Sequence, residues 1–360
     1  MNILIVEVNW LGDVLFSTPA IKALRKQFPD SRISCLIVPR VKEVLENNPY
    51  IDELIINDEE GLHKGFFGWL KLVKALKSKN FDLAVFFHRS FSRALIAYLS
   101  GISRRLGYTT WKRRFLLTEA LALPKKDSLH RVDHYLNIVK SLGCAVDDKY
   151  YEFFLSQEDE RFAEDFWNKE GLKKGDWIVC LNPGGNWDPK RWPKENFASL
   201  ADRLIREYQA KIIFSGSKDD ILLIKEITRM MEQKEFSVSA GYTNLKAAGA
   251  IFKKANLTIS GDSGPLHIAA SVGANVLALF GPTSPAITGP IGASTSLSAD
   301  GERGKSIGKG KVVIIQKRLD CRIPCYDLNC NDNRCMREIK VEDVLAEVKK
   351  LAEDAHRNEV

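Results

Sequence analysis

The chain has 360 residues, of which 45% are hydrophobic and 28% charged, and its formal net charge is +7. This length allows about two domains, and this composition excludes disordered, collagen-like and disulfide-scaffold proteins. No apolar run approaches the ~18 residues of a membrane span, and no basic segment precedes an apolar stretch at the N-terminus, so we expect a cytoplasmic protein without a secretory signal.

Strands and helices alternate from the first residue. We predict strands at residues 2–8, 32–38, 53–56 and 81–87, and helices near 14–28, 41–46, 66–79 and 131–142. This alternation predicts right-handed βαβ units around a parallel sheet.

The pattern restarts after an acidic stretch at 157–160 and a Gly-Leu-Lys-Lys-Gly turn at 171–175, which together indicate a domain junction. We predict strands at 177–182, 211–215, 237–239, 257–260 and 276–280, a helix at 193–208, and a surface loop in the Gly- and Ser-rich segment 294–310. The chain is thus expected to contain one α/β domain at 1–160, a second at 175–340, and a helix at 341–360 that packs back across the junction.

Positive charge is concentrated between residues 61 and 140. This stretch holds 16 Lys and Arg against four acids, a net charge of +12, so the rest of the chain carries −5. An anionic partner such as a phosphorylated lipid, a membrane surface or a nucleic acid would suit it. Within it, Phe66, Phe67, Trp69, Leu70 and Val73 interleave with Lys64, Lys71, Lys74 and Lys77. A helix lying on anionic headgroups has this pattern, but we favour a core-packing helix with a solvated lysine face.

Asn9-Trp10-Leu11-Gly12-Asp13 follows the first strand and opens the first helix. Ligands bind at this edge of an open parallel sheet, and Asp13 would direct its carboxylate there. A helix N-cap is the equally plausible alternative role for Asp13. A Gly-x-Gly-x-x-Gly fingerprint is absent, which disfavours a nicotinamide dehydrogenase.

Two further motifs lie in the second half. Asn182-Pro183-Gly184-Gly185-Asn186, followed by Lys190-Arg191-Trp192-Pro193, offers backbone N–H groups and a lysine to a phosphate. The Walker spacing is missing, so a P-loop ATPase is not supported. Gly261-Asp262-Ser263-Gly264-Pro265-Leu266-His267 forms a second anion-binding turn at a helix N-terminus, without the Gly-x-Ser-x-Gly elbow of a hydrolase.

Taken together, and with the later Phe-Gly-Pro-Thr-Ser-Pro, these motifs resemble the ADP-heptose:lipopolysaccharide heptosyltransferases of glycosyltransferase family 9 over nearly the whole chain. The resemblance implies a GT-B fold of two Rossmann-like, doubly wound domains facing a cleft, the N-terminal domain (1–160) binding the acceptor and the C-terminal domain (175–340) binding the nucleotide sugar. It also implies an inverting, metal-independent and cofactor-free transfer of heptose from ADP-heptose to the inner core of lipopolysaccharide.

The resemblance also assigns residues. Asp13 would be the general base and Lys190 would meet the diphosphate. The donor site would comprise Gly184, Gly185, Asn186, Lys218, Asp262, Ser263, Gly264 and His267. Gly185 and Asn186 stand where some members carry two hydroxyl residues on the phosphate, so the contacts there would come from backbone N–H groups or the Asn186 amide. Lys218 stands where some members carry a glutamate near the ribose, so the nucleoside contacts differ there. Lys71, Lys74 and Lys77 are the candidate contacts to an anionic, lipid-linked acceptor, with peripheral association at the cytoplasmic face of the inner membrane.

Two features favour structural roles. Cys321, Cys325, Cys330 and Cys335 miss the Cys-x2-Cys pairs of most zinc sites, so we expect reduced thiols and no metal. His130 and His134 are four residues apart, but capping, packing or contact with the acceptor is favoured over metal binding, because no Glu follows His130 as in a metalloprotease.

Two alternatives stay open. A GT-B transferase could use another nucleotide sugar or another glycan acceptor, because fold alone does not fix the substrate. A nucleic-acid-binding protein ranks lower, since no RNA-binding or helix-turn-helix signature accompanies the basic stretch, and we expect no nucleic-acid partner.

Overall fold

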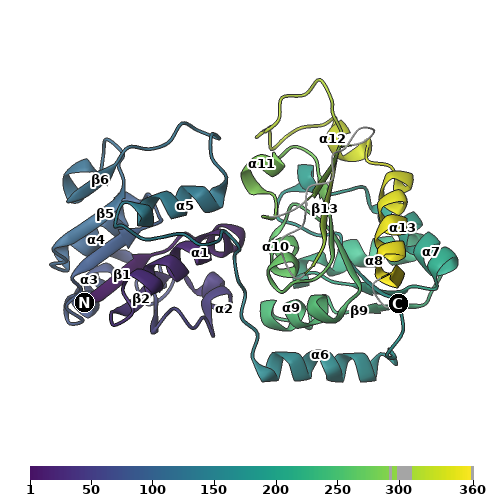
Figure 1. Cartoon of the computed structure of the whole chain (residues 1–360), viewed down its shortest axis with the longest axis horizontal. Coiled ribbons are helices and arrows are strands. Elements are labelled where there is room, and N and C mark those ends of the chain that lie inside the picture. The colour runs from purple at the N-terminus through teal and green to yellow at the C-terminus, as the bar shows by residue number, and fades with distance from the viewer. Residues whose placement is uncertain (292–293, 298–309, 358–360) are drawn as a thin grey trace. The chain divides into compact units, whose positions relative to one another are not determined.

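The computed structural model describes residues 1–291, 294–297 and 310–357. It divides into two compact units, Met1–Phe154 and Leu155–Val360. Each unit contains one parallel sheet with helices packed on it (Figure 1).

The first unit is built on a six-stranded sheet in the order β3-β2-β1-β4-β5-β6. Its strands are β1 (Asn2–Val6), β2 (Arg32–Ile37), β3 (Glu53–Ile56), β4 (Leu83–Phe86), β5 (Arg104–Tyr108) and β6 (Glu119–Leu121). Its helices are α1 (Leu11–Gln27), α2 (Lys42–Leu45), α3 (Gly65–Lys77), α4 (Phe91–Leu99) and α5 (Arg131–Lys140), with short 3-10 turns η1 (Pro39–Val41) and η2 (Arg114–Leu116). α1 packs against α5, and α3 packs against α4. Both faces of central β1 are covered, so its apolar residues run consecutively without alternation.

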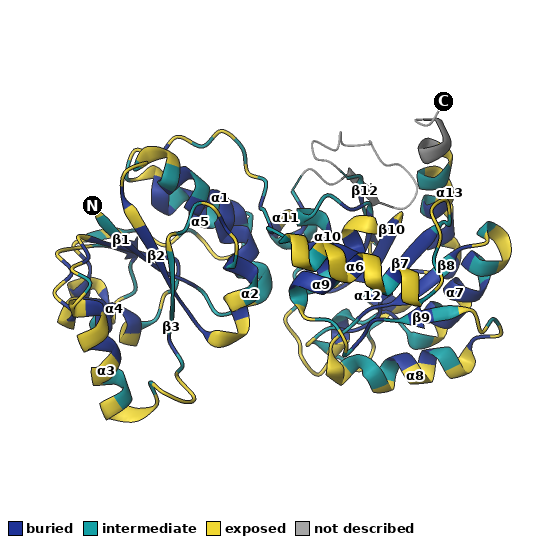
Figure 2. Ribbon diagram, turned by 90° about the horizontal axis from the view of Figure 1, so that it is seen from below, coloured by how far each residue is buried: buried dark blue, intermediate teal, exposed yellow. Residues whose placement is uncertain are grey.

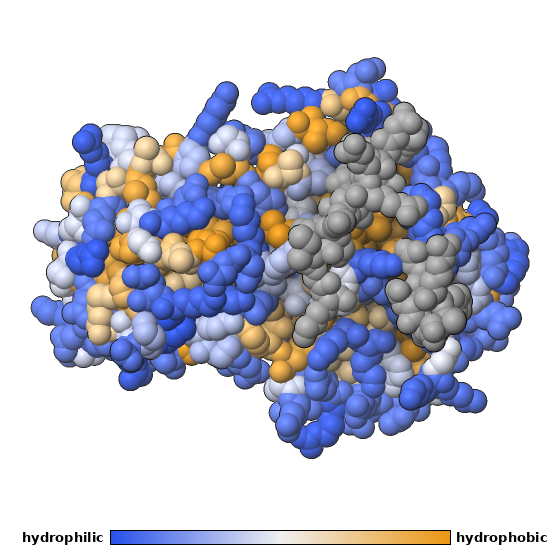
Figure 3. Space-filling view, in the orientation of Figure 1, coloured by the Kyte–Doolittle hydropathy of each residue, from blue (hydrophilic) through white to orange (hydrophobic). Residues whose placement is uncertain are grey.

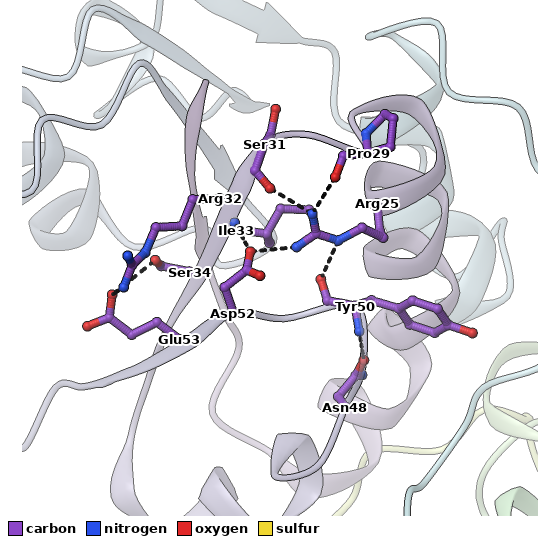
Figure 4. Close-up of polar contacts among 10 residues, drawn as sticks. All are labelled: Arg25, Pro29, Ser31, Arg32, Ile33, Ser34, Asn48, Tyr50, Asp52 and Glu53. Carbon is purple, nitrogen blue, oxygen red and sulfur yellow. Dashed lines mark hydrogen bonds and ion pairs between the residues drawn. The ribbon is translucent and has the colours of Figure 1, made fainter.

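Arg25, near the end of α1, makes a network of hydrogen bonds at the amino-terminal edge of this sheet (Figure 4). Its guanidinium donates to the backbone oxygens of Tyr50, Pro29 and Ser31 and to the Asp52 carboxylate at 2.5 Å. Burial would raise the pKa of Asp52, but the backbone N–H of Ile33 and the charge of Arg25 outweigh it and lower that pKa. This network holds α1 and the β2–β3 connection together, leaving the carboxyl edge for chemistry.

The second unit is built on a seven-stranded parallel sheet in the order β12-β13-β11-β10-β7-β8-β9. Its strands are β7 (Ile178–Asn182), β8 (Lys211–Phe214), β9 (Phe236–Val238), β10 (Leu257–Gly261), β11 (Val276–Phe280), β12 (Ser294–Leu297) and β13 (Val312–Gln316). Its helices are α6 (Gln157–Lys169), α7 (Lys194–Tyr208), α8 (Ile221–Met230), α9 (Leu245–Lys254), α10 (Gly264–Ser271), α11 (Pro285–Thr288), α12 (Arg334–Arg337) and α13 (Val341–Arg357). Two 3-10 turns, η3 (Asp188–Lys190) and η4 (Lys218–Asp220), follow β7 and β8.

The terminal helix α13 contributes Val344 and Val348 to the core of the second unit, beside Leu200 and Leu204 of α7. Its packing back across the domain junction stays a prediction, as do the domain boundaries. Among the described helices, none has the length and apolar character that crossing a bilayer requires.

The structure differs from the sequence-based predictions at three places. The acidic residues 157–160 begin α6 instead of forming a linker, because Ser156 and Asp159 make a capping box in which each side chain accepts the other's backbone N–H. Residues 294–297 form strand β12 on the edge of the sheet, whereas 298–309 of the predicted loop lie outside the described residues. Phe66 and Phe67 of α3 are exposed, not buried, since the helix packs through Leu72, Val73 and Leu76 (Figure 2).

Candidate active site

An ion pair between Lys190 and Asp262 lies at the carboxyl edge of the second sheet. Lys190 ends η3, and Asp262 immediately follows β10. The Lys190 Nζ lies 2.7 Å from Asp262 Oδ2, and His267 Nε2 lies 3.4 Å from Asp262 Oδ1. The Asp262 side chain is only 4% exposed. The sequence motifs around residues 190 and 262 therefore meet in one place.

The charge on Asp262 is maintained by these partners. Burial by itself would raise the pKa of Asp262, but the hydrogen bond with His267 and the positive charge of Lys190 outweigh burial and hold the pKa well below its usual range. Asp262 is therefore a carboxylate at neutral pH, and it fixes the Lys190 ammonium at the end of the sheet.

The loop after β7 approaches this pair closely. At Gly185 the backbone has φ +152°, and a Cβ there would lie 3.8 Å from Ser263 Cβ, so the two glycine-containing motifs are neighbours. The carbonyl oxygen of Gly185 accepts hydrogen bonds from Arg191 Nε and Nη2 at 2.9 and 2.6 Å. At Gly184 a Cβ would lie 2.2 Å from Asp220 Oδ1, so a larger residue would displace the Asp220 side chain.

The N-terminus of α10 offers N–H groups to an anion. The hydroxyl of Ser263, the residue before α10, lies 3.1 Å from the Ser260 hydroxyl and makes no cap hydrogen bond to the helix. The helix therefore begins without a side-chain cap, and the first-turn N–H groups of Gly264 and Leu266 carry the positive end of its dipole. Phosphate groups bind at such termini.

Three buried polar atoms around the site have no hydrogen-bond partner among the described residues: Asn182 Oδ1, Trp187 Nε1 and Thr283 Oγ1. Each lies in or just beyond the carboxyl end of β7 or β11. The Trp187 ring also lies 5.3 Å from Lys190 Nζ. Buried polar groups are normally paired, so these three atoms are candidate contacts for a polar ligand at this edge of the sheet. Sequence reasoning assigned no role to Asn182, Trp187 or Thr283, because only the folded chain shows that these atoms are unpaired.

The structure brings together seven of the predicted donor-site residues: Gly184, Gly185, Lys190, Asp262, Ser263, Gly264 and His267. Asn186 and Lys218 are exposed, and no hydrogen bond among the described residues joins either to the Lys190–Asp262 pair. Lys218 begins η4, with its stem beside Gly241. Their roles in phosphate and ribose binding stay predictions.

In the first unit, Asp13 lies in the first turn of α1 at the carboxyl edge of the sheet. Trp10 occupies the N-cap position, so the alternative that Asp13 is the N-cap is wrong. Asp13 Oδ1 accepts a hydrogen bond from the Tyr135 hydroxyl at 3.1 Å and lies 4.0 Å from Arg131 Nε. Both contacts engage Oδ1, and Tyr135 is buried, so the carboxylate is held in a defined orientation.

A second carboxyl group, Glu7, lies near Asp13 and is fully buried. Burial raises the pKa of Glu7 to about 8, opposed by hydrogen bonds from Ser17 and the Val8 N–H and by the charge of Arg93, and reinforced by Asp13. Glu7 is therefore largely protonated at neutral pH. The sequence signal was its position as a lone acid directly after an apolar strand.

Cationic groups surround this edge. Burial and nearby arginines together lower the pKa values of His88 and His134 to about 4. The arginines are Arg93, Arg113 and Arg89 for His88, and Arg131 and Arg89 for His134. Both histidines are neutral at physiological pH, so the permanent positive charge here comes from arginine.

The lysines proposed for acceptor binding lie elsewhere. Lys71, Lys74 and Lys77 are exposed along α3, which runs toward the amino edge of the sheet. Just beyond the helix, Lys79 forms an ion pair with Glu53 at the start of β3. Their placement therefore does not show contact with an acceptor bound at Asp13. Their role in acceptor binding stays a prediction.

The remaining candidates have structural partners. His130 caps α5, since its Nδ1 accepts the Val132 N–H at 3.1 Å, and the His134 ring packs 4.5 Å from that of Tyr108, which confirms the capping and packing prediction. Near the C-terminus, the sulfur of Cys330 accepts the Asn333 N–H, and Cys335 Sγ donates to the Asn333 side chain. Among the described residues, no three His, Cys, Asp or Glu side chains are arranged to hold a metal.

Comparison with known proteins gives a consistent result. The model of glycosyltransferase family 9 (heptosyltransferase) matches residues 69–317. Lipooligosaccharide heptosyltransferase 2 of Haemophilus influenzae is 32% identical, covering 81% of this chain and 86% of that protein. Lipopolysaccharide heptosyltransferase 3 of Escherichia coli is 31% identical, covering 77% and 81%. The crystal structure of a family 9 glycosyltransferase from Veillonella parvula superposes with a TM-score of 0.82 at 27% identity, covering 97% and 96%.

The two Rossmann-like domains and this similarity define a glycosyltransferase of the GT-B fold, which confirms the predicted fold class and enzyme class. The chain belongs to glycosyltransferase family 9, the heptosyltransferase family.

Proposed function

We propose that this enzyme transfers a heptose from ADP-heptose to the inner core of lipopolysaccharide, with inversion at the anomeric carbon. The observation that carries the proposal is the partly buried Lys190–Asp262 ion pair beside the uncapped N-terminus of α10. The relatives' names, lipooligosaccharide and lipopolysaccharide heptosyltransferases, support heptose and lipopolysaccharide as the substrate classes.

In this proposal the diphosphate of the donor binds at the carboxyl edge of the second sheet. The ammonium of Lys190 and the N–H groups of Gly264 and Leu266 would stabilise the negative charge that develops on the leaving diphosphate. Asp262 and His267 are positioning residues in this account, because Asp262 anchors Lys190 and His267 holds the second oxygen of Asp262. The buried polar atoms of Asn182, Trp187 and Thr283 are unpaired among the described residues. In this proposal they form hydrogen bonds with the bound donor.

Transfer in this proposal is independent of metal ions. Positive charge is needed where the diphosphate leaves. The ammonium of Lys190 and the positive end of the α10 helix dipole would supply it. Full activity in excess chelator is the expected result.

Asp13 is the proposed general base. One carboxylate must take the proton of the attacking hydroxyl in an inverting displacement, and Asp13 has its Oδ1 held by Tyr135. Oδ2 is then the oxygen available to the acceptor. Glu7 is unsuited to this step, because it is fully buried and its pKa of about 8 keeps it largely protonated at pH 7.

The acceptor in this proposal is the anionic, lipid-linked core, used at the cytoplasmic face of the inner membrane by a peripherally bound enzyme. Exposed Arg89 and partly exposed Arg131, at the edge that carries Asp13, suit phosphate or carboxylate groups on such an acceptor. Lys71, Lys74 and Lys77 would contribute longer-range attraction to the anionic surface.

Calorimetric titration with ADP, UDP, GDP and ADP-heptose tests the donor assignment. We expect ADP and ADP-heptose to bind more tightly than the other nucleotides. Tighter binding of UDP would indicate that the donor is a different nucleotide sugar. Failure of all four compounds to bind would contradict the proposed donor site.

A further inference from the structure

Exposed aromatic and aliphatic side chains gather on the first unit at one edge of its sheet. We define this apolar rim by its members: Leu62, Phe66, Phe67, Leu70, Phe91, Trp111 and Phe115. Phe67 is 84% exposed, Trp111 85%, Phe115 72% and Phe66 68%. A large apolar patch of this kind on a protein surface indicates an interaction site.

The rim segments follow three parallel strands of one sheet, and the packing of α3 against α4 brings the segments after β3 and β4 close together. Leu62 to Leu70 follow β3, Phe91 follows β4, and Trp111 and Phe115 follow β5. All these strands are parallel, so their carboxyl ends lie at the same edge. Two contacts join the segments: Arg93 pairs with Glu59 at 3.1 Å, and the rings of Phe91 and Phe115 lie 6.2 Å apart.

The exposure of Phe66 and Phe67 is built into the local fold. The Asp58 carboxylate accepts the backbone N–H groups of Gly61 and Leu62, which folds the segment before α3 into a turn. At Gly68 a Cβ would collide with the His63 backbone at 2.5 Å, so only glycine lets this turn lie against the helix. The rings of Phe66 and Phe67 contact each other edge to face, with their centroids 5.8 Å apart, and both residues are exposed (Figure 2 shows the exposed surface of α3).

Positive charge is interspersed among the rim residues. Lys64, Arg89, Lys112 and Arg114 are all exposed. Throughout the described chain, no carboxylate lies within ion-pair distance of any of these four. Of the acids nearest to the rim, Glu59 is paired with Arg93, Asp58 is engaged in the turn, and Glu60 is exposed, so cations outnumber exposed acids here. Figure 3 likewise shows hydrophobic residues interspersed with hydrophilic ones on the face of the first unit that it presents.

We infer that the apolar rim docks the enzyme on an anionic phospholipid surface. Phe66, Phe67 and Trp111 would enter the boundary between headgroups and acyl chains, and the four cations would contact the headgroup phosphates. The inference rests on the proposed function for its biological meaning, since Asp13 and the rim share the carboxyl edge of one sheet. A membrane bound there would hold the lipid anchor of the acceptor at the edge that carries the proposed base.

Vesicle co-sedimentation tests the docking surface directly. The full-length protein is mixed with vesicles of phosphatidylglycerol and phosphatidylcholine, or of phosphatidylcholine alone. We expect binding to the anionic vesicles, weakened by salt. The double variant Phe66→Ser with Phe67→Ser should lose about tenfold or more of its vesicle affinity, because two large apolar side chains no longer enter the interface. The triple variant Lys64→Gln, Lys112→Gln and Arg114→Gln should lose mainly the salt-sensitive part.

A matched control comes from the second unit, where Leu222 is 72% exposed and Tyr242 is 81% exposed. Replacing both by Ser removes a similar apolar area and should leave vesicle binding unchanged. Circular dichroism checks that each variant is folded.

Activity on two forms of acceptor separates this inference from the proposed function. The Phe66→Ser, Phe67→Ser variant should transfer heptose normally to a soluble, delipidated core and poorly to the same core embedded in vesicles. Absence of transfer by the wild type, with the rim-dependent vesicle binding intact, would refute the proposed function and leave the docking surface standing. The inference would be overturned if the wild type and the rim variant bound vesicles equally. It would also be overturned if the wild type did not bind vesicles and the rim variant changed from dimer to monomer.

Discussion

Replacing Lys190 by Ala is the most informative single change in the donor site. The Asp262 carboxylate is 4% exposed and its partner Lys190 is 24% exposed. Removing one member of a buried ion pair costs about 3–5 kcal/mol, because the other charge is left uncompensated. Lys190 is only partly buried and His267 remains, so we expect a loss of about 2–3 kcal/mol in the free energy of unfolding of the second domain.

The same substitution should lower turnover more than this loss of stability explains. Removal of one group that stabilises charge in a transition state typically reduces kcat by about 10²–10³-fold. We expect Lys190→Ala to show this reduction with weaker binding of ADP. Urea denaturation, steady-state kinetics and calorimetry measure the three quantities on one preparation.

The double variant Lys190→Ala with Asp262→Asn separates chemistry from folding. Asn is close in size to Asp and uncharged, so the double variant should recover stability but not turnover. Recovery of wild-type kcat in the double variant would mean that Lys190 serves only to neutralise Asp262. Normal ADP binding and kcat in Lys190→Ala alone would refute the phosphate assignment.

Three other predictions concern the carboxyl groups of the first unit and the cysteines. Asp13→Asn should reduce kcat by about 10²–10⁴-fold with donor affinity nearly unchanged, because an amide cannot accept the acceptor's proton; a folded variant with wild-type kcat would exclude Asp13 as the base. The pKa of Glu7 is raised from 4.5 to about 8, so the folded state keeps a proton that the unfolded state releases, and stability falls as pH rises through this window. Glu7→Gln should therefore stabilise the protein relative to wild type, by about 3–5 kcal/mol at pH 8 and far less at pH 5; urea denaturation giving the same difference at both pH values would contradict the burial argument. Changing Cys325 and Cys330 to Ser should leave activity intact, and protein purified under reducing conditions should contain no tightly held metal; stoichiometric zinc or iron by elemental analysis would show otherwise.

Much of the fold was predictable because its signals are local. The apolar runs of β1 and β11 and the helix of residues 194–208 lie within one or two residues of their predicted places. β5 and α4 were not predicted. β5 begins with Arg104 and Arg105, and its position beside β4 is set by strand pairing that no local pattern reveals. α3 was assigned correctly as a helix, but its exposed aromatic residues depend on which side packs against α4.

The candidate site was predictable in its residues and not in its contacts. The three motifs located Asp13, Lys190 and Asp262 by their positions after strands. The partners of these residues are far apart in sequence: Tyr135 contacts Asp13 across 122 residues, and Lys190 contacts Asp262 across 72. Only the fold brings these side chains together, and only the fold buries Glu7 enough to raise its pKa.

The central claim is most directly tested by the transfer reaction itself. The purified enzyme is incubated in excess chelator with ADP-heptose and a core acceptor that lacks the heptose, and the product is analysed by mass spectrometry and by NMR of the new anomeric centre. We predict addition of one heptose, with inverted configuration and release of ADP, at a rate unchanged by the chelator. Failure to transfer from ADP-heptose, together with transfer from a different nucleotide sugar, would contradict the account.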